Sequence, residues 1–230
     1  MTRPDLLLLH GALGAGDQFS ALLPLLGMIG KVHTPDFEGH GQAESVDRPF
    51  RAEYFVENII RYLEDNDLSV VDIFGYSMGG FVGLCLARLY SDRVRRIFTF
   101  ATKFHWTPDT AAREASYLDP DILLQKAPEF AHALEIRHSR CGWKTVLAKT
   151  KEMTLRLCRE SLLSEADFRL ISQPARLTMG DRDKMVSLEE TIATFRLLPN
   201  AQLQIFPATP HPIEQVSSET LATAMTHYFK

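Results

Sequence analysis

The sequence has few of the features that mark a secreted, membrane-embedded or nucleic-acid-binding protein. Only three cysteines occur in 230 residues, and their wide spacing excludes a disulfide framework or a CxxC metal site. The early apolar run, the four leucines at 6–9, is too short for a signal-peptide core or a membrane span. A formal charge of −4 comes with no strongly basic tract. We therefore expect a cytoplasmic protein with reduced thiols, and neither nucleic acid nor membrane as a partner.

The length of 230 residues, with 45% hydrophobic residues, fits a single domain with one large core. Short apolar runs predict six strands, at 5–10, 31–36, 69–74, 93–102, 174–181 and 201–208. Helical spacing of apolar residues lies between most of them, at 17–26, 51–67, 78–92, 187–198 and 214–229. This alternation predicts an α/β fold, a parallel sheet with helices on both faces.

One long stretch interrupts the alternation. Residues 104–170 contain no convincing strand but have helical spacing, most clearly over 119–138 and 144–161. We expect a helical lid inserted after the fourth strand, with 1–103 and 171–230 forming the core. Ligands of open α/β sheets bind beyond the carboxyl ends of the strands, so a lid leaving such an end would cover the site.

A serine stands between two glycines in "GYSMG" (75–79), after a predicted strand and before a predicted helix. A serine hydroxyl is a weak nucleophile that needs a base, an exposed position and donors for the oxyanion. A sharp strand-to-helix turn exposes it, and small flanking residues permit such a turn. Ser77 is therefore a candidate nucleophile, the alternative being an ordinary residue of a glycine turn.

Three further motifs stand at predicted strand ends: "HGALG" (10–14), "DFEGHG" (36–41) and "GDRDKMV" (180–186), followed by the late His211. With "GYSMGG", they make the chain resemble the α/β-hydrolase superfamily. More narrowly, it is similar to the small lidded esterase-like branch, with carboxylesterases, the pimeloyl-carrier-protein methyl esterase and the menaquinone-pathway enzyme. The resemblance covers nearly the whole chain outside the lid. Family members normally begin with two antiparallel strands that this sequence lacks, so we expect a reduced, mainly parallel sheet of about six strands.

The resemblance implies a catalytic triad of Ser77, Asp183 and His211, in the chain order typical of this fold. It also implies that the backbone amides of Ala12 and Met78 form the oxyanion hole. No metal and no organic cofactor are implied. His10, Asp36 and His40 are expected to be structural.

Some alternatives remain open for the triad. Asp181 is a second carboxylate beside Asp183, and we expect it to be a turn former because the family pattern Gly-x-x-Asp falls on Asp183. His227 is a weaker candidate base than His211, since it lies within the last helical pattern. The family usually has glycine before the base, where this chain has Pro210.

Aromatic residues near the site suggest how substrate is held. Tyr76, Phe104, Trp106 and Trp143 are candidate substrate-binding residues, and aromatics that line an acyl pocket are one interpretation. The other is that the lid aromatics form the core of the lid.

The segment 132–159 has seven basic residues against two acidic ones. One interpretation is a surface for an acidic acyl carrier protein, a carboxylate or a CoA substrate. The other is a solvated helical face.

The sequence thus predicts a serine hydrolase that cleaves a carboxylic ester or thioester, free or carrier-bound, through an acyl-enzyme. The alternatives are a cofactor-free haloperoxidase or perhydrolase with the same triad, and a non-catalytic small-ligand binder. Phe81 stands where the menaquinone-pathway enzyme has an arginine, which argues against that lyase activity. Dehalogenases and epoxide hydrolases of this fold use an aspartate nucleophile, so Ser77 argues against both.

Overall fold

The computed structural model describes residues 4–45 and 47–230, so residues 1–3 of the predicted core and residue 46 lie outside the described chain. Six strands form one sheet, in the order β2-β1-β3-β4-β5-β6, and every pair is parallel. They are β1 (Asp5–Leu9), β2 (Val32–His33), β3 (Val71–Tyr76), β4 (Val94–Phe100), β5 (Ala175–Gly180) and β6 (Ala201–Phe206). The predicted six-stranded parallel sheet is confirmed.

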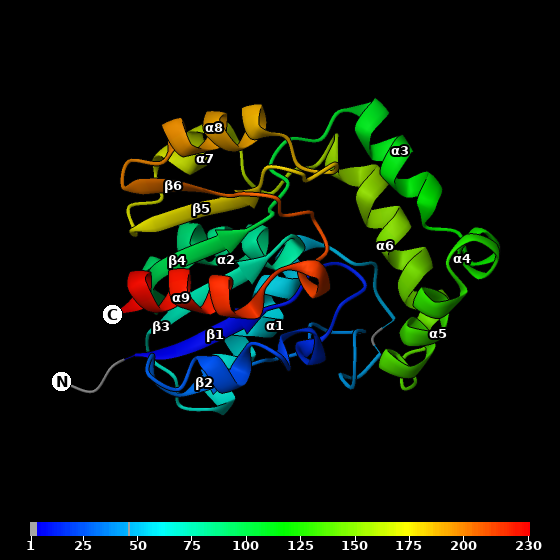
Figure 1. The fold of residues 1–230 in the computed structure, drawn as a ribbon, viewed down its shortest axis with the longest axis horizontal. Coiled ribbons are helices and arrows are strands. Elements are labelled where there is room, and N and C mark those ends of the chain that lie inside the picture. The colour runs from blue at the N-terminus through cyan, green and yellow to red at the C-terminus, as the bar shows by residue number, and fades with distance from the viewer. Residues whose placement is uncertain (1–3, 46) are drawn as a thin grey trace.

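Both faces of the sheet are packed, and the apolar side chains of β1, β3 and β4 enter one of two hydrophobic cores. In β1, Leu7 and Leu9 join the core under α1 (Ala52–Asp65) and α2 (Met78–Leu89). Leu6 and Leu8 join the opposite core, which α9 (Ser218–Phe229) covers. A further helix, α8 (Leu188–Leu197), packs on β5 and β6. Figure 1 shows this layered arrangement.

Five helices lie between β4 and β5, within residues 104–170, which we call the β4–β5 helical segment. They are α3 (Pro108–Tyr117), α4 (Pro120–Lys126), α5 (Pro128–Arg137), α6 (Trp143–Leu157) and α7 (Glu165–Arg169). In Figure 1, α3–α6 lie together beyond the carboxyl ends of the strands, while α7 lies next to α8. Residues 119–138, which have helical spacing in the sequence, form two helices in the structure, α4 and α5. Pro128 has no N–H to donate and disfavours helical backbone at Ala127, so a new helix begins at the proline.

One difference concerns residues 17–26, where the pattern predicts a helix. The structure has two short 3-10 helices instead, Gly16–Phe19 and Leu23–Leu25. Pro24 cannot donate to the preceding turn, which prevents a continuous α-helix. The apolar residues still serve the core, since Phe19, Leu22 and Leu26 are buried.

Candidate active site

Ser77 occupies a sharp turn between β3 and α2. Its backbone has φ 50° and ψ −116°, a conformation that costs a non-glycine residue about 1–3 kcal/mol and persists only where surrounding structure enforces it. The Ser77 amide donates to the carbonyl of Phe100 on the neighbouring strand, at 2.8 Å. The turn thereby presents the hydroxyl beyond the carboxyl end of the sheet, as the sequence predicts.

The glycines of the motif are required by close packing. A Cβ atom at Gly75 would collide with the backbone of Gly80. A Cβ atom at Gly79 would collide with the carbonyl oxygen of Leu9 in β1. Helix α2 therefore lies against the ends of β1 and β3 at a distance that only glycine allows.

His211 joins Ser77 to Asp183. The hydroxyl Oγ of Ser77 lies 3.3 Å from Nε2 of His211, and Nδ1 of His211 lies 2.7 Å from Oδ2 of Asp183. The Asp183 side chain is fully buried. Its Oδ1 accepts hydrogen bonds from the amides of Met185 and Val186, each at 2.8 Å. These bonds fix the carboxylate, which in turn orients the imidazole ring.

The neighbouring candidates lie elsewhere. Asp181 accepts a hydrogen bond from the amide of Thr209, at 3.2 Å, and so fastens the loop that leads to His211. His227 lies in the last turn of α9. Pro210 does not prevent contact between His211 and Ser77.

Ala12 and Met78, whose amides are the predicted oxyanion donors, both lie beside Ser77. Ala12 and Met78 both line the cavity there, and neither amide donates a hydrogen bond to another group of the described chain. Ala12 belongs to a tight turn in which the Gly14 amide donates to the Gly11 carbonyl, at 3.1 Å. Leu13, the next residue, has φ +58°, which is uncommon outside glycine. The amides are therefore available to an oxyanion at Ser77.

The cavity at Ser77 is small and mainly apolar. Its volume is about 70 Å³, and since a water molecule takes about 30 Å³ of liquid volume, this is room for about two water-sized groups. Apart from Ser77, Ala12, Met78 and Lys103, its walls are Ala52, Phe55, Phe81, Val82, Trp106, Met153, Thr154, Leu157 and Met185. Met153, Thr154 and Leu157 belong to α6, so the β4–β5 helical segment forms part of the wall of this cavity.

The four predicted substrate-binding aromatics have different locations. Trp106 lines both the cavity at Ser77 and a larger pocket beside it, whereas Phe104 lines only the larger one. The Tyr76 hydroxyl donates to the carbonyl of His211, at 3.3 Å, so Tyr76 supports the histidine loop. Trp143 lines neither of these two pockets and packs in the core at the start of α6, which agrees with the alternative interpretation.

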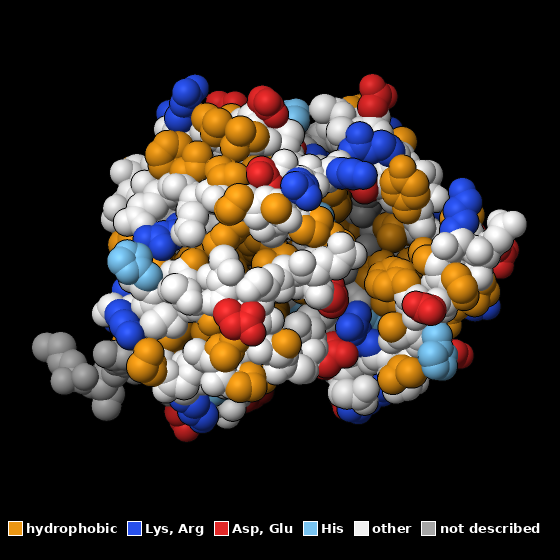
Figure 2. All heavy atoms as spheres, viewed as in Figure 1, with side chains coloured by type: hydrophobic (Ala, Val, Ile, Leu, Met, Phe, Trp, Pro, Cys, Tyr) orange, Lys and Arg blue, Asp and Glu red, His pale blue; other side chains and the backbone are white. Residues whose placement is uncertain are grey.

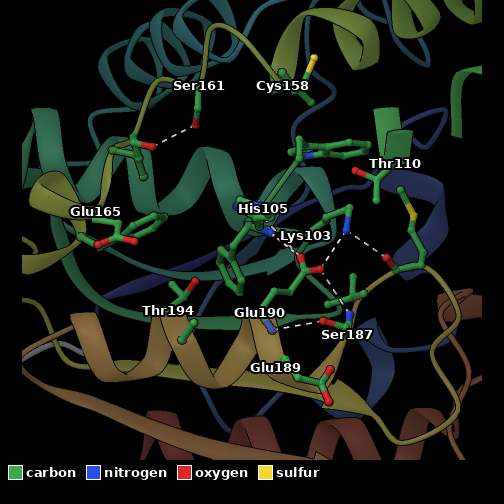
Figure 3. A pocket seen from close by; sticks show the side chains of 18 of the residues that line it. Lys103, His105, Thr110, Cys158, Ser161, Glu165, Ser187, Glu189, Glu190 and Thr194 are labelled. Atoms are coloured by element: carbon green, nitrogen blue, oxygen red, sulfur yellow. Dashed lines mark hydrogen bonds and ion pairs between the residues drawn. The ribbon is translucent and has the colours of Figure 1, made fainter. Parts of the chain in front are cut away.

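The larger pocket has a volume of about 960 Å³, and a buried ion pair lies at its base (Figure 3). Nζ of Lys103 lies 2.8 Å from Oε2 of Glu190 and also donates to the carbonyl of Met185, at 3.2 Å. Oε1 of Glu190 accepts from the amide of Phe104, at 2.9 Å. The pair links the loop after β4 to the loop that carries Asp183. No local pattern indicates this ion pair, because Lys103 and Glu190 are 87 residues apart in the chain.

Three buried histidines lie next to the Ala12 loop. The ring of His40 lies between the other two, with its centroid 5.2 Å from that of His10 and 5.8 Å from that of His138. Burial lowers the pKa of each, that of His10 to about 4. In His10, Nδ1–H donates to the Gly11 carbonyl and Nε2 accepts from the Phe37 amide, so the neutral ring satisfies both partners. The sequence pointed to His10 and His40 as structural, but not to His138.

Part of the basic segment 132–159 is engaged with the core. Arg137 forms an ion pair with Asp17, at 2.9 Å, and Arg140 forms one with Glu44, at 3.4 Å. Lys149 donates to the carbonyl of Arg48. These three residues therefore fasten the segment to the core, which reduces the charge that remains for a partner.

Metal sites and membrane spans are two other features to consider in the described ranges, 4–45 and 47–230. These ranges contain no group of three or more His, Cys, Asp or Glu side chains that could hold a metal ion. None of their helices is both long enough and apolar enough to cross a membrane.

Known proteins resemble this chain in sequence and in fold. The family model of the alpha/beta hydrolase fold matches residues 4–138. The pimeloyl-[acyl-carrier protein] methyl ester esterase of Aromatoleum aromaticum is 30% identical over 92% of each chain. The 2-hydroxymuconate semialdehyde hydrolase of Pseudomonas putida is 26% identical over 86% of this chain and 76% of its own.

Solved structures agree at the level of the fold. A thermophilic esterase from Thermogutta terrifontis superposes with a TM-score of 0.79 at 20% identity, covering 99% of this chain and 89% of its own. The sheet, the elbow at Ser77 and the matched family model agree with one another. The chain therefore belongs to the α/β-hydrolase fold family.

Proposed function

We propose that this protein is a serine hydrolase that cleaves a carboxylic ester or thioester through an acyl-enzyme intermediate. The observation that carries the proposal is the chain of contacts from Ser77 Oγ to His211 Nε2, at 3.3 Å, and from His211 Nδ1 to Asp183, at 2.7 Å. Two unpaired backbone amides beside the same hydroxyl supply the second requirement of acyl transfer.

Each residue has a role in the first half-reaction. His211 takes the proton of the Ser77 hydroxyl through Nε2, and the oxygen attacks the acyl carbon. The negative charge moves to the former carbonyl oxygen, where the amides of Ala12 and Met78 stabilise it. Asp183 keeps the Nδ1 proton on His211 and stabilises the imidazolium. His211 then donates its new proton to the departing alcohol or thiol.

The second half-reaction repeats these steps with water. His211 removes a proton from a water molecule, which attacks the acyl carbon bound to Ser77. The oxyanion again forms at Ala12 and Met78, and collapse of the intermediate releases the acid. His211 returns the proton to Ser77, so the protein ends unchanged and no cofactor takes part.

The walls of the two pockets suggest the substrate class. The small apolar cavity at Ser77 favours a short acyl group, held against Trp106 and the apolar residues of α6. We propose that residues 104–170 act as a lid, since α6 forms part of the wall of this cavity and α3–α6 lie beyond the strands' carboxyl ends (Figure 1). Figure 2 shows hydrophobic side chains around the hollow between this segment and the sheet.

A carrier-bound or acidic ester is one form of this substrate. The relative from Aromatoleum aromaticum is named for a carrier-bound methyl ester. The larger pocket adjoins the cavity at Ser77 through shared walls, including Lys103 and Trp106, and has room for an extended polar chain. Of the basic residues, Lys144, Arg156 and Arg159 are exposed on this segment.

The test is hydrolysis of p-nitrophenyl esters from acetyl to palmitoyl, with the Ser77→Ala variant as control. We expect turnover that is greatest for short acyl chains and is lost in the variant. A methyl ester should then be compared free and bound to an acyl carrier protein. Faster turnover of the carrier-bound form would identify the carrier as part of the substrate.

Other results would favour the alternatives. Peroxide-dependent bromination in acetate without ester hydrolysis would indicate a perhydrolase. Failure of a fluorophosphonate probe to label Ser77 in folded protein would indicate a ligand-binding protein that lacks catalysis.

A further inference from the structure

His138 lies at the end of α5 and joins the β4–β5 helical segment to two loops of the core. Its side chain is fully buried. Nε2–H donates to the carbonyl of Leu13, at 3.0 Å, and Nδ1 accepts from the amide of Gly41, at 2.9 Å. One imidazole ring therefore spans two loops that are distant from it in sequence.

The conformation of Leu13 affects the proposed oxyanion site, because this residue follows Ala12 in the same turn. Leu13 directly follows Ala12 and holds a left-handed conformation, with φ +58°, that a leucine rarely adopts. Such a conformation persists only when surrounding groups enforce it. Within the turn, the enforcing contact is the bond from the Gly14 amide to the Gly11 carbonyl. His138 adds a second contact, from outside the turn, to the carbonyl of the strained residue itself.

The two bonds of His138 require a single form of the ring. Because Gly41 is a donor, Nδ1 must carry a lone pair, and because Leu13 offers an acceptor, Nε2 must carry the proton. The neutral ring with Nε2 protonated meets both needs. Arg140, in the turn that follows α5, does not bind residues 11–14. It donates to the carbonyl of Gln42 instead.

We propose that His138 is a positioning residue that holds the turn 11–14 so that the Ala12 amide points at the oxyanion. The inference rests on the proposed hydrolase function of Ser77. If His138 has this role, the oxyanion hole forms fully only when the β4–β5 helical segment is packed against the core. Loss of one oxyanion donor lowers kcat by about 10²–10³-fold in hydrolases, so a displaced donor should cost about 10–100-fold.

Two conservative variants separate this role from general support of the fold. In His138→Gln, the amide nitrogen reaches the position of Nε2 and can still donate to Leu13. In His138→Asn, the amide oxygen replaces Nδ1 as acceptor for Gly41, but the bond to Leu13 is lost. Each variant loses one hydrogen bond, so a merely structural role predicts similar effects. We expect a kcat about 10–100-fold lower in the Asn variant, an unchanged KM, and recovery of most of the kcat in the Gln variant.

Several measurements complete the test. Arg140→Ala loosens the same turn without contacting residues 11–14 and should leave kcat for a short p-nitrophenyl ester unchanged. The pH dependence of kcat should keep its midpoint in the Asn variant, because His211 and Asp183 are untouched. Equal losses in the Asn and Gln variants, or a loss confined to KM, would overturn the proposal.

A separate readout tests His138 if the wild-type protein shows no Ser77-dependent turnover, which would refute the proposed function. Hydrogen exchange of the Gly14 amide reports directly on the turn 11–14. Faster exchange in His138→Asn but not in His138→Gln would still support the positioning role. Equal protection in the two variants and the wild type would contradict it.

Discussion

The Nδ1 atom of His211 lies 2.7 Å from Oδ2 of Asp183, and Oδ1 of Asp183 accepts two backbone amides. One oxygen of the carboxylate is thus fixed by the backbone, and the other orients the imidazole ring of His211. Neighbouring Asp181 has a different task, because it binds the amide of Thr209. These two carboxylates allow a matched test of the proposed triad.

Replacing Asp183 with Asn should lower kcat by about 10³–10⁴-fold, because the amide favours the wrong tautomer of His211. Replacing Asp181 with Asn should leave kcat nearly unchanged. The measurement is steady-state hydrolysis of a short p-nitrophenyl ester by both variants. Similar losses in the two variants would contradict the assignment of Asp183 as the triad acid.

The wall of the cavity at Ser77 predicts chain-length selectivity. Leu157 lines the cavity, so Leu157→Ala should enlarge it and move the preferred acyl chain to a longer ester. Leu155, two residues earlier on α6, is exposed and provides the control variant. Relative kcat/KM across the ester series measures the shift. An unchanged optimum in Leu157→Ala would place the acyl group elsewhere.

The buried pair of Lys103 and Glu190 should matter for stability. Lys103→Met leaves the Glu190 carboxylate buried without its partner, which typically costs about 3–5 kcal/mol. Arg113 pairs with Glu114 at the surface, and Arg113→Met should cost less than about 1 kcal/mol. Urea unfolding gives the free energy of each variant. A Lys103→Met protein as stable as the wild type would refute the prediction.

Acid should destabilise the protein through the buried histidines. Burial lowers the pKa of His10 from 6.5 to about 4, with Asp36, Arg137 and His138 as charged or titratable neighbours. Because the unfolded chain binds the proton first, the stabilisation is complete above pH 6.5 and is lost as pH falls towards 4. His10 alone accounts for on the order of 3 kcal/mol.

This loss can be measured by urea unfolding at pH values between 7.5 and 4. His132 is exposed on α5, so a His132→Gln variant should follow the wild-type curve. A free energy of unfolding that stays constant from pH 7 to pH 4 would show that His10 titrates equally in both states.

Glycine at position 79 should be essential. An added Cβ atom meets the Leu9 carbonyl, which belongs to the sheet and cannot move aside, so Gly79→Ala should cost at least about 1–3 kcal/mol and lower activity. Gly27 has no heavy atom within 4 Å of an added Cβ atom. Gly27→Ala should therefore be neutral or slightly stabilising. Thermal unfolding of the two variants compares them directly, and equal midpoints would argue against the packing explanation.

Local patterns were sufficient to predict the sheet. The strands contain short stretches rich in apolar residues, and their alternation with helices is typical of a parallel topology. The contact of His211 with Ser77 and Asp183 follows from the same topology, since all three residues come after the carboxyl ends of strands.

Contacts between distant segments could not be predicted. His138 binds Leu13 across 125 residues, and nothing in the local sequence marks that histidine as buried. Glu190 fits an ordinary helix start, where it does receive a capping bond, so its pairing with Lys103 has no separate signal. Pro24 lies within residues 17–26, where apolar spacing favours a helix, and the structure has two short 3-10 helices there.

The β4–β5 helical segment leaves and rejoins the sheet at two adjacent strands, and Ser77, Asp183 and His211 all lie outside it. Its helices could therefore diverge or be grafted from a relative without any change in the connectivity of the sheet. Such an exchange is constrained where the segment is tied to the core, above all at the turn containing His138. An exchanged segment would thus have to restore the hydrogen bonds of His138 and the ion pair of Arg137 with Asp17, as well as its part of the wall of the cavity at Ser77.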